Sequence, residues 1–331
     1  MNVLVTGANG FVGAEVCKKL LAAGHSVRGM VRKTSDLSLL EDIDVSLTFG
    51  SLIDEKSMEA AAEGIDVVCH IAAFVSDWGR YEAMYEINVE GTRRLLDKAA
   101  EAGCSRFVFI SSAAVHSFID AGDMDEDSPQ HDTRYSYCLT KREAENIVMA
   151  YHKKGAIEGV VVRPGDVYGP GDRTSLLKMT AMLEKGRLAL IDRGEKLGAF
   201  TYVENLADAI VLCCFADKAA GEAFVITDGV KMTWQEYFTK LTGELNLPGP
   251  RWSVPGPLAA GAAAFLETLY KVLRIKARPP LTRYLVEHLC GDFNFKPKKA
   301  KKLLGYTPRV DVDTAIKKTA EWYEKKVRGS G

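Results

Sequence analysis

Short apolar runs alternate along the chain with longer segments whose apolar residues recur at helical spacing. The apolar runs predict strands at residues 3–5, 25–32, 45–49, 66–71, 106–110 and 159–163. The periodic segments predict helices at 14–23, 54–63, 81–102 and 134–154. Beyond Pro164 the pattern loosens and predicts helices at 176–185 and 203–215, strands at 188–191 and 222–227, and a mostly helical segment from about 233. Strands and helices in this order indicate an α/β fold with a parallel sheet covered on both faces.

The first strand leads into a glycine-rich turn. Gly7, Gly10 and Gly13 follow Thr6, and the first predicted helix comes directly after them. This order is typical of the phosphate-binding opening of a doubly wound nucleotide-binding fold, in which a side chain would hold the backbone away from the pyrophosphate. The helix N-terminus then offers free N–H groups to the phosphate oxygens. A tight turn that holds no ligand is the alternative.

Composition narrows the class of protein. The chain has 331 residues, of which 47% are hydrophobic and 26% charged, and a net charge of −1, so it offers no electrostatic footprint for nucleic acid. Its 7 cysteines are an odd number without a C-x-x-C pair, which predicts reduced thiols in the cytoplasm and neither disulfides nor a zinc site. The first strand begins at Asn2 and leaves no room for a signal peptide. The Asp-rich loop 120–127 is interpreted as a solvated surface loop, and no metal is expected.

One apolar stretch raises the question of a membrane. The unbroken run 257–266 is shorter than the roughly twenty residues of a spanning helix, and Glu267 and Lys271 interrupt its continuation. We therefore expect no spanning segment. A helix that lines an apolar pocket and a helix that rests on a membrane surface both remain open.

Tyr137 and Lys141 are the strongest catalytic candidates from spacing alone. They lie four residues apart on a predicted helix, so their side chains share one face. An ammonium group beside a phenol favours the phenolate, and we expect Lys141 to lower the pKa of Tyr137 toward a working range.

Several motifs together resemble those of an extended short-chain dehydrogenase/reductase, within the NAD(P)-dependent epimerase/dehydratase superfamily. The motifs are Thr6–Gly13 (TGANGFVG), His70–Ala73 (HIAA), Asn88–Thr92 (NVEGT), Ser111-Ser112, Tyr137-x-x-x-Lys141 and Arg163–Gly171 (RPGDVYGPG). The resemblance implies a Rossmann doubly wound parallel sheet with a smaller, mostly helical C-terminal substrate domain. Residues 1–165 plus about 200–227 would form the NAD(P)-binding domain, and about 166–199 plus 228–328 the substrate-binding domain.

The resemblance also implies residue roles. Tyr137 would be the general acid/base, and Lys141 would bind the nicotinamide ribose. Ser112, rather than Ser111, would hydrogen-bond the reacting oxygen, where charge develops during hydride transfer. The implied cofactor contacts are Gly7, Asn9, Gly10, Phe11, Val12, Gly13, Arg32, Lys33, Ser51, Leu52, Ala72, Ala73, Asn88, Tyr137, Lys141, Pro164 and Val167.

The end of the second predicted strand bears on cofactor choice. Relatives that prefer NAD end this strand with an Asp, whereas this chain has Val31 followed by Arg32 and Lys33. A guanidinium suits a 2′-phosphate, so NADP(H) is predicted over NAD(H). Many relatives also carry an adenine-contacting Asp where this chain has Ser51. A solvated arginine without a ligand is the alternative.

The substrate is predicted to be largely apolar. The stretch Leu197–Asn205 (LGAFTYVEN) lacks the arginine that helps sugar-nucleotide relatives hold the diphosphate, and it is similar to the form found in 3β-hydroxysteroid and 4-carboxysterol dehydrogenase relatives. Residues 27–32 resemble the corresponding strand of the dihydroflavonol reductase branch, whose members use NADP(H). The predicted substrate contacts are Asp77, Trp78, Tyr81, Ser112 and Ala113.

The resulting prediction is a cytoplasmic NADP(H)-dependent oxidoreductase that interconverts a secondary alcohol and a ketone on a steroid-, sterol- or dihydroflavonol-like substrate. The alternatives are an NAD-dependent nucleotide-sugar epimerase or dehydratase and a non-catalytic NAD(P)-sensing regulator. The family commonly dimerises through the helix that carries the tyrosine and lysine, so a homodimer is expected.

Overall fold

A seven-stranded parallel sheet forms the centre of the molecule, as the apolar runs predict. The computed structural model describes residues 1–118 and 123–329. The strands lie in the order β11-β7-β5-β4-β1-β2-β3, and every neighbouring pair is parallel. Their bounds are β1 Asn2–Thr6, β2 Ser26–Val31, β3 Ser46–Phe49, β4 Val67–His70, β5 Arg106–Ile110, β7 Glu158–Pro164 and β11 Ala223–Ile226. The central strands are buried along their length, which is why they read as continuous apolar runs.

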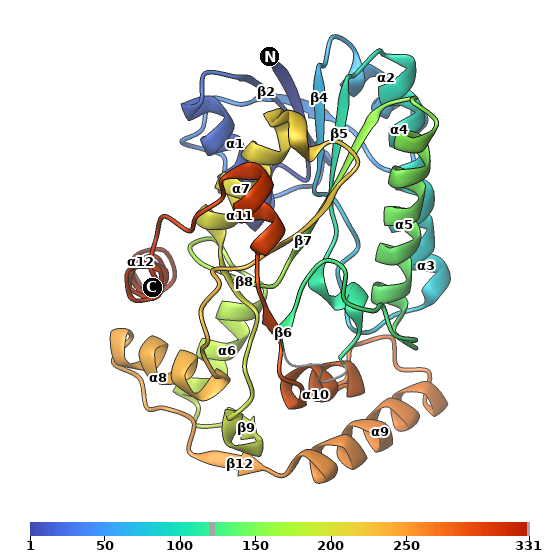
Figure 1. Cartoon of the computed structure of the whole chain (residues 1–331). Helices are drawn as coiled ribbons and strands as arrows, with labels where there is room; N and C mark the ends of the chain where they lie inside the picture. The colour runs from blue at the N-terminus through green and yellow to red at the C-terminus, as the bar shows by residue number, and fades with distance from the viewer. Residues whose placement is uncertain (119–122, 330–331) are drawn as a thin grey trace.

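Helices cover both faces of this sheet (Figure 1). One face packs against α1 (Phe11–Ala22) and α7 (Val203–Phe215). The other packs against α2 (Glu55–Ala62), α4 (Gly91–Glu101) and α5 (Ser136–Lys153). The fold is therefore the predicted Rossmann-type α/β arrangement.

The predicted helix 81–102 is present but contains a wider turn. It runs as α3 (Tyr81–Tyr85), a π-helical segment η1 (Glu86–Glu90) and then α4. Such π segments inside α-helices occur frequently at functional sites, and this one carries Asn88.

The sheet order places a crevice at the end of β1. The chain builds β1, β2 and β3 outward on one side and then crosses over to β4 on the other side of β1. Ligands of open α/β sheets bind outside the carboxyl ends of the strands at such a reversal. The glycine turn after β1 and the loop 71–80 after β4 both lie at this edge.

The second half of the chain forms smaller layers below the carboxyl edge of the sheet, as oriented in Figure 1. Three two-stranded parallel pairs, β10–β8, β12–β9 and β13–β6, connect its parts. The strand bounds are β6 Asp123–Met124, β8 Asp166–Tyr168, β9 Ala189–Ile191, β10 Phe200–Tyr202, β12 Trp252–Val254 and β13 Asn294–Phe295. The helices are α6 Ser175–Glu184, α8 Trp234–Glu244, α9 Gly256–Val272, α10 Arg283–Cys290, α11 Lys298–Leu304 and α12 Val312–Tyr323. Short helical turns complete the chain at η2 Ala113–His116, η3 Asp192–Gly194, η4 Asp217–Ala219 and η5 Glu324–Arg328.

One segment of the expected substrate domain lies elsewhere. Ala300 and Leu304 of α11, together with Tyr306, join the core between the sheet and α7. The chain thus returns from the smaller half to the larger one before α12, and the division of 228–328 as one unit does not describe this stretch.

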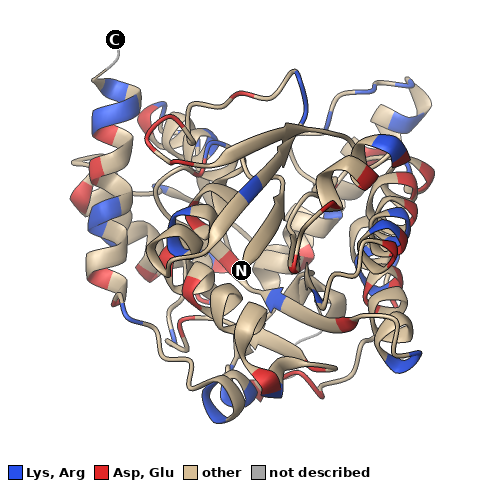
Figure 2. Ribbon diagram, turned by 90° about the horizontal axis from the view of Figure 1, so that it is seen from above, with Lys and Arg blue, Asp and Glu red and all other residues tan. Residues whose placement is uncertain are grey.

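The charge distribution agrees with the near-zero net charge. In the view of Figure 2, acidic and basic residues are interspersed on the helices that flank the sheet, without a continuous field of one sign. No helix of the described residues combines the length and apolar character needed to cross a membrane. The same residues contain no cluster of metal-ligating side chains. Residues 120–122 of the Asp-rich loop lie outside the described part.

Candidate active site

The glycine turn is held so tightly that two of its glycines have no room for a side chain. A Cβ atom on Gly13 would lie 2.1 Å from the carbonyl oxygen of Gly7. Gly7 has a φ of +69°, and its Cβ would lie 3.1 Å from the Cα of Ala72 in the loop after β4. These contacts account for the spacing of the motif, because the turn packs against the helix on one side and against a second loop on the other.

This turn fits the pyrophosphate of a dinucleotide. Gly10 is the N-cap of α1, without a side-chain cap, and the first helical turn has no acidic residue. The first N–H groups of α1 therefore remain available to an anion. Asn9, Phe11 and Val12 belong to the same turn.

A buried hydrogen-bonded chain ties the turn to the helix that follows β4. The Thr6 hydroxyl lies 2.7 Å from Nδ1 of His70, and Nε2 of His70 lies 3.0 Å from the Thr92 hydroxyl. Burial and the nearby charge of Lys141 lower the pKa of His70 to about 3. Sequence reasoning quoted His70 and Thr92 only as parts of motifs and assigned them no role.

Asn88 connects the loop 71–80 to α5. Its side-chain oxygen accepts the Phe74 N–H at 2.7 Å, and its amide donates to the Phe74 carbonyl at 3.1 Å and to the Thr140 hydroxyl at 3.2 Å. Thr140 directly precedes Lys141 on α5. The π-helical segment thus aims one buried amide at both walls of the crevice.

Ser112, Tyr137 and Lys141 come together at the carboxyl end of β5. Ser112 follows this strand and hydrogen-bonds Tyr137, the second residue of α5. The Lys141 ammonium donates to the Ile110 carbonyl at 2.8 Å and lies 4.7 Å from the centre of the Phe109 ring. Burial lowers the pKa of Lys141 to about 7. Ser111 is buried beside this group.

The expectation that Lys141 lowers the pKa of Tyr137 is not met. Burial raises the pKa of Tyr137, and the hydrogen bond with Ser112 only partly offsets that rise. The cause is that Lys141 is directed at a backbone carbonyl at the end of β5, so burial outweighs any charge effect on the phenol.

The residues expected to choose the cofactor lie on the surface beside the glycine turn. The Gly7 N–H donates to the Met30 carbonyl at 3.1 Å, which brings the end of β2 next to the turn. Arg32 and Lys33 follow β2, are exposed, and make no ion pair within the described part of the chain. Ser51 and Leu52 follow β3, and Leu52 packs against Gly91 of α4.

The other expected cofactor contacts lie along the same edge. Ala73 follows Ala72 in the loop after β4. Pro164 ends β7, and Val167 lies in β8 just beyond it. Ala113, expected to contact substrate, is buried against Ala199 and Val225.

The three residues of the loop 71–81 that were expected to contact substrate all engage protein groups. Both carboxylate oxygens of Asp77 accept hydrogen bonds, from Arg278 at 2.6 Å and from Thr282 at 2.7 Å. The Lys271 ammonium lies 5.6 Å from the Trp78 ring. The Tyr81 hydroxyl donates to Glu143 of α5 at 2.6 Å.

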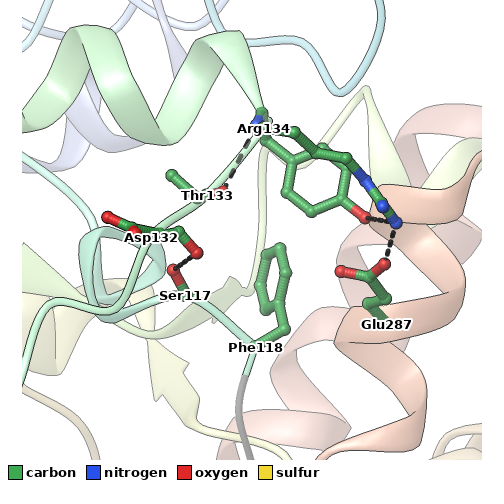
Figure 3. Close-up of a pocket in the computed structure, with 7 residues that line it drawn as sticks. Ser117, Phe118, Asp132, Thr133, Arg134 and Glu287 are labelled. Carbon is green, nitrogen blue, oxygen red and sulfur yellow. Dashed lines mark hydrogen bonds and ion pairs between the residues drawn. The ribbon is translucent and has the colours of Figure 1, made fainter.

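A cluster of aromatic rings lies next to the start of α5, which carries Tyr137, and most of this cluster was not predicted from the sequence. The Phe118 ring lies 4.7 Å from that of Tyr284 and 5.8 Å from that of Tyr135, centre to centre. A cavity of about 340 Å³ opens here between the start of α5 and α10. Phe118 and Tyr135 line it, and Arg134 bonds both the Tyr135 hydroxyl and Glu287 of α10. Figure 3 shows Phe118 facing this cavity and Arg134 directed at Glu287. A tyrosine and a histidine four apart, Tyr284 and His288, were the available signal, but nothing local relates α10 to α5.

His288 and Asp166 form a polar pair at the edge of this aromatic cluster. Nε2 of His288 lies 2.8 Å from Oδ1 of Asp166, and this carboxylate raises the pKa of His288. The His288 ring stacks on Phe293 with centres 5.3 Å apart. Its Nδ1 is buried without a hydrogen-bond partner in the described structure.

Three features now define the class of protein: the parallel sheet with its reversal at β1, the glycine turn, and the helix that carries Tyr137 and Lys141. They are those of an NAD(P)-dependent enzyme of the extended short-chain dehydrogenase/reductase type. A family model of the NAD dependent epimerase/dehydratase family matches residues 3–227, and the chain belongs to this family. The predicted superfamily is thereby confirmed.

Individual relatives match over almost the whole chain. It is 30% identical over 327 residues to 2-alkyl-3-oxoalkanoate reductase of Stenotrophomonas maltophilia, covering 96% of this chain and 98% of that protein. It is also 30% identical over 339 residues to sterol demethylase protein B of Methylococcus capsulatus, covering 98% and 99%. Among solved structures, that of gox2253 superposes with a TM-score of 0.82 at 28% identity and covers 98% of each chain.

Proposed function

We propose that the protein is an NADP(H)-dependent oxidoreductase that interconverts a secondary alcohol and a ketone on a largely apolar substrate. The observation that carries this proposal is the position of Tyr137. Its hydroxyl is hydrogen-bonded to Ser112, and Tyr137 lies near Tyr284, whose ring packs edge-on against that of Phe118.

Tyr137, Ser112 and Lys141 would have different roles at the reacting oxygen. Because burial raises its pKa, Tyr137 holds its proton at neutral pH and acts as the acid that protonates the oxygen of a ketone. Ser112 donates a second hydrogen bond to the same oxygen, where negative charge develops. Lys141, one helical turn after the tyrosine, holds a buried amine on the Ile110 carbonyl. A bound nicotinamide dinucleotide would supply the hydride chemistry, held by the glycine turn and the edge of loops described above.

The apolar nature of the substrate rests on two supports. Phe118, Tyr135 and Tyr284 offer ring surface beside the tyrosine, and apolar surface favours apolar ligands. Two relatives carry names that refer to an alkyl-oxoalkanoate and to a sterol.

The proposed preference for NADP(H) rests on Arg32 and Lys33. Both are exposed beside the glycine turn and free of ion pairs within the described residues, so a 2′-phosphate would meet two available cations. Titration of the protein with NADPH and NADH, followed by intrinsic fluorescence, tests this preference. Tighter binding of NADH would contradict it.

Replacement of Tyr137 by Phe tests the function. We expect a loss of turnover of about 10²–10⁴-fold on a ketone panel read by nicotinamide absorbance, with cofactor affinity nearly unchanged. Tyr151→Phe is the matched control, because Tyr151 lies on the same helix and bonds Asp97 far from the crevice. Unchanged turnover in the Tyr137 variant would overturn the assignment.

A nucleotide-sugar epimerase or dehydratase is the second candidate, because the family description includes both activities. NAD retained through purification, or a rise in melting temperature with a UDP- or dTDP-sugar, would favour it.

A homodimer formed through α5 and a cytoplasmic location are further proposals. Light scattering and fractionation test them.

A further inference from the structure

Helix α9 exposes several large apolar side chains, and the apolar residues that it buries are small. Gly256, Ala259 and Ala263 are buried against the protein. On the other side, the side chains of Phe265 and Val272 are 67% and 73% exposed. A surface helix ordinarily buries its large apolar residues, so this arrangement is inverted.

The exposed residues form one stripe rather than scattered points. Leu258, Phe265, Leu269 and Val272 are separated by seven, four and three residues, which places them on one face of the helix. Leu273 and Ile275 continue the exposed apolar surface just past the end of α9. We call these six residues the α9 face. A contiguous apolar surface of this kind on a water-soluble protein marks an interaction site.

The segment that contains the α9 face carries mainly positive charge. From residue 245 to 286 the chain has six Lys and Arg residues but a single acid, Glu267. Glu267 is buried and paired with Arg283. Arg251, Arg274 and Lys276 are exposed, and none has an ion pair in the part of the chain that the structure describes. The exposed charges of residues 251–276 that lack an ion pair in the described structure are therefore all positive. The exposed acid next to them is Asp192, whose carboxylate accepts the Gly256 N–H at the start of α9.

The α9 face adjoins the catalytic crevice. Lys271 lies over Trp78, and Arg278 holds Asp77, so the helix and the segment after it contact the loop 71–80. α9 also packs against α10, which carries Tyr284. Figure 1 shows α9 along the lower edge of the molecule, with α10 above it.

We propose that the α9 face docks on an anionic lipid bilayer. The apolar side chains enter the boundary between headgroups and acyl chains, and Arg251, Arg274 and Lys276 meet the acidic headgroups. The docking itself does not depend on the proposed function. If the substrate is apolar as proposed, docking sets the crevice beside the phase in which such a substrate dissolves.

The charges distinguish a bilayer from a second copy of the chain. A two-fold dimer places the same patch on both sides of the interface. It would bring Arg251, Arg274 and Lys276 toward their own counterparts, and the one acid of residues 245–286 is buried and already paired. An anionic surface offers the opposite sign to all three.

Co-sedimentation with lipid vesicles tests the proposal on the full-length protein. Vesicles of phosphatidylcholine with about 30% phosphatidylglycerol should bind it, vesicles of phosphatidylcholine alone should bind it far less, and added salt should release it. Arg274→Gln with Lys276→Gln should weaken binding about 30-fold, from about tenfold per 1.4 kcal/mol and about 1 kcal/mol per cation. Phe265→Ser with Val272→Ser should weaken it at least tenfold.

Two matched controls separate this site from general stickiness. Lys301→Gln with Lys302→Gln removes two cations from α11, which lies on the other half of the molecule. Phe49→Ser removes a 52% exposed ring at the end of β3. Both should leave vesicle binding unchanged.

Two results would overturn the proposal. One is equal binding to neutral and anionic vesicles, or none to either. The other is a dimer in lipid-free solution that Phe265→Ser with Val272→Ser converts to monomer, which would assign the face to a second copy. Turnover of a water-soluble ketone without vesicles should stay normal in the α9 variants, so failure of docking and failure of the proposed function can be told apart.

Discussion

The Thr6 hydroxyl has one proton and three hydrogen-bond neighbours, and this fixes the form of a buried histidine. Thr6 accepts from the N–H groups of Ile71 and Ala72, so its own proton goes to Nδ1 of His70. His70 is then neutral with its proton on Nε2, which donates to Thr92, and Thr92 in turn donates to the Asn88 carbonyl. Every group in this chain is satisfied only while His70 stays neutral.

A pH dependence of stability follows from this neutral histidine. Its pKa is about 3 in the folded protein and near 6.5 in an unfolded chain. Below pH 6.5 the unfolded state therefore binds a proton at His70, whereas the folded state stays unprotonated there. The free energy of unfolding then falls by about 1.4 kcal/mol for each unit that the pH is lowered. Between about pH 8 and pH 5 the free energy of unfolding, measured with urea, should fall in wild type by about 2 kcal/mol more than it falls in His70→Gln.

The comparison isolates His70, because the buried His116, whose pKa is also lowered, is present in both proteins. Parallel pH profiles for the two proteins would show that His70 does not titrate as argued. The variant is expected to be less stable than wild type at every pH, so the test compares the slopes of the free energy of unfolding against pH.

At this scale the sequence was informative where the chemistry is local. The glycine turn, Ser112 and the Tyr137–Lys141 pair depend on residues close together in the chain, and they lie at one edge of the sheet. Tyr284 and His288 were not predicted, since their place beside Tyr137 depends on how α10 packs. The effect expected of Lys141 on Tyr137 was wrong, because spacing gives the shared helix face but not the burial or the competing Ile110 carbonyl.

At the scale of elements, one buried ion pair joins α5, β7 and the loop before α5. Nη2 of Arg163 lies 2.7 Å from Oε2 of Glu145, and Nη1 donates to the Glu126 carbonyl at 3.0 Å and contacts Nε2 of His116 at 3.2 Å. Arg163 and Glu145 are both nearly inaccessible to water. Removing one partner from such a pair strands the other charge.

Glu145→Gln should therefore destabilise the protein by about 3–5 kcal/mol in chemical unfolding. The matched control is Glu15→Gln, which removes a surface pairing with Lys18 and should cost less than about 1 kcal/mol. A small effect of Glu145→Gln would mean that water or another group compensates the arginine.

Helices and strands were largely predictable from the sequence because their apolar periodicity reflects the core directly. The strand pattern located every strand of the main sheet to within a few residues. The π-helical segment at Asn88 was not predicted, since a single wider turn inside a continuous helix leaves the apolar pattern almost unchanged. The same pattern gave no sign that α11 returns to the larger half, because packing partners are not encoded in periodicity.

At the scale of the whole molecule, Asp77 connects the sheet-edge loop to the second half of the chain. Arg278 and Thr282 lie just before α10 and both donate to its carboxylate. These partners hold the pKa of Asp77 below its ordinary value against the opposing effect of burial. Arg278 lies about 200 positions from Asp77 in the sequence. The sequence around Asp77 therefore did not show this partner, and we predicted that Asp77 contacts the substrate.

Arg278→Ala should loosen this junction without unfolding the protein. We expect amide hydrogen exchange at residues 74–80 to become about fivefold faster or more, equivalent to about 1 kcal/mol of local stability. Arg193→Ala, at an exposed arginine near Glu195, is the control and should leave the loop unchanged. Unchanged exchange in the Arg278 variant would show that Asn88 alone holds the loop.

The position of β11 determines when the sheet can be completed during synthesis. Among the described residues β11 pairs with β7 alone, yet roughly 60 residues separate the end of one strand from the end of the other. At about 5–20 residues per second, a ribosome needs roughly 3–12 s to deliver them. During that interval β7 presents a bare apolar edge, and the sheet face that α7 later covers is open to water. The chain is therefore most exposed to misassociation after its catalytic tyrosine helix has been made and before its last sheet strand arrives.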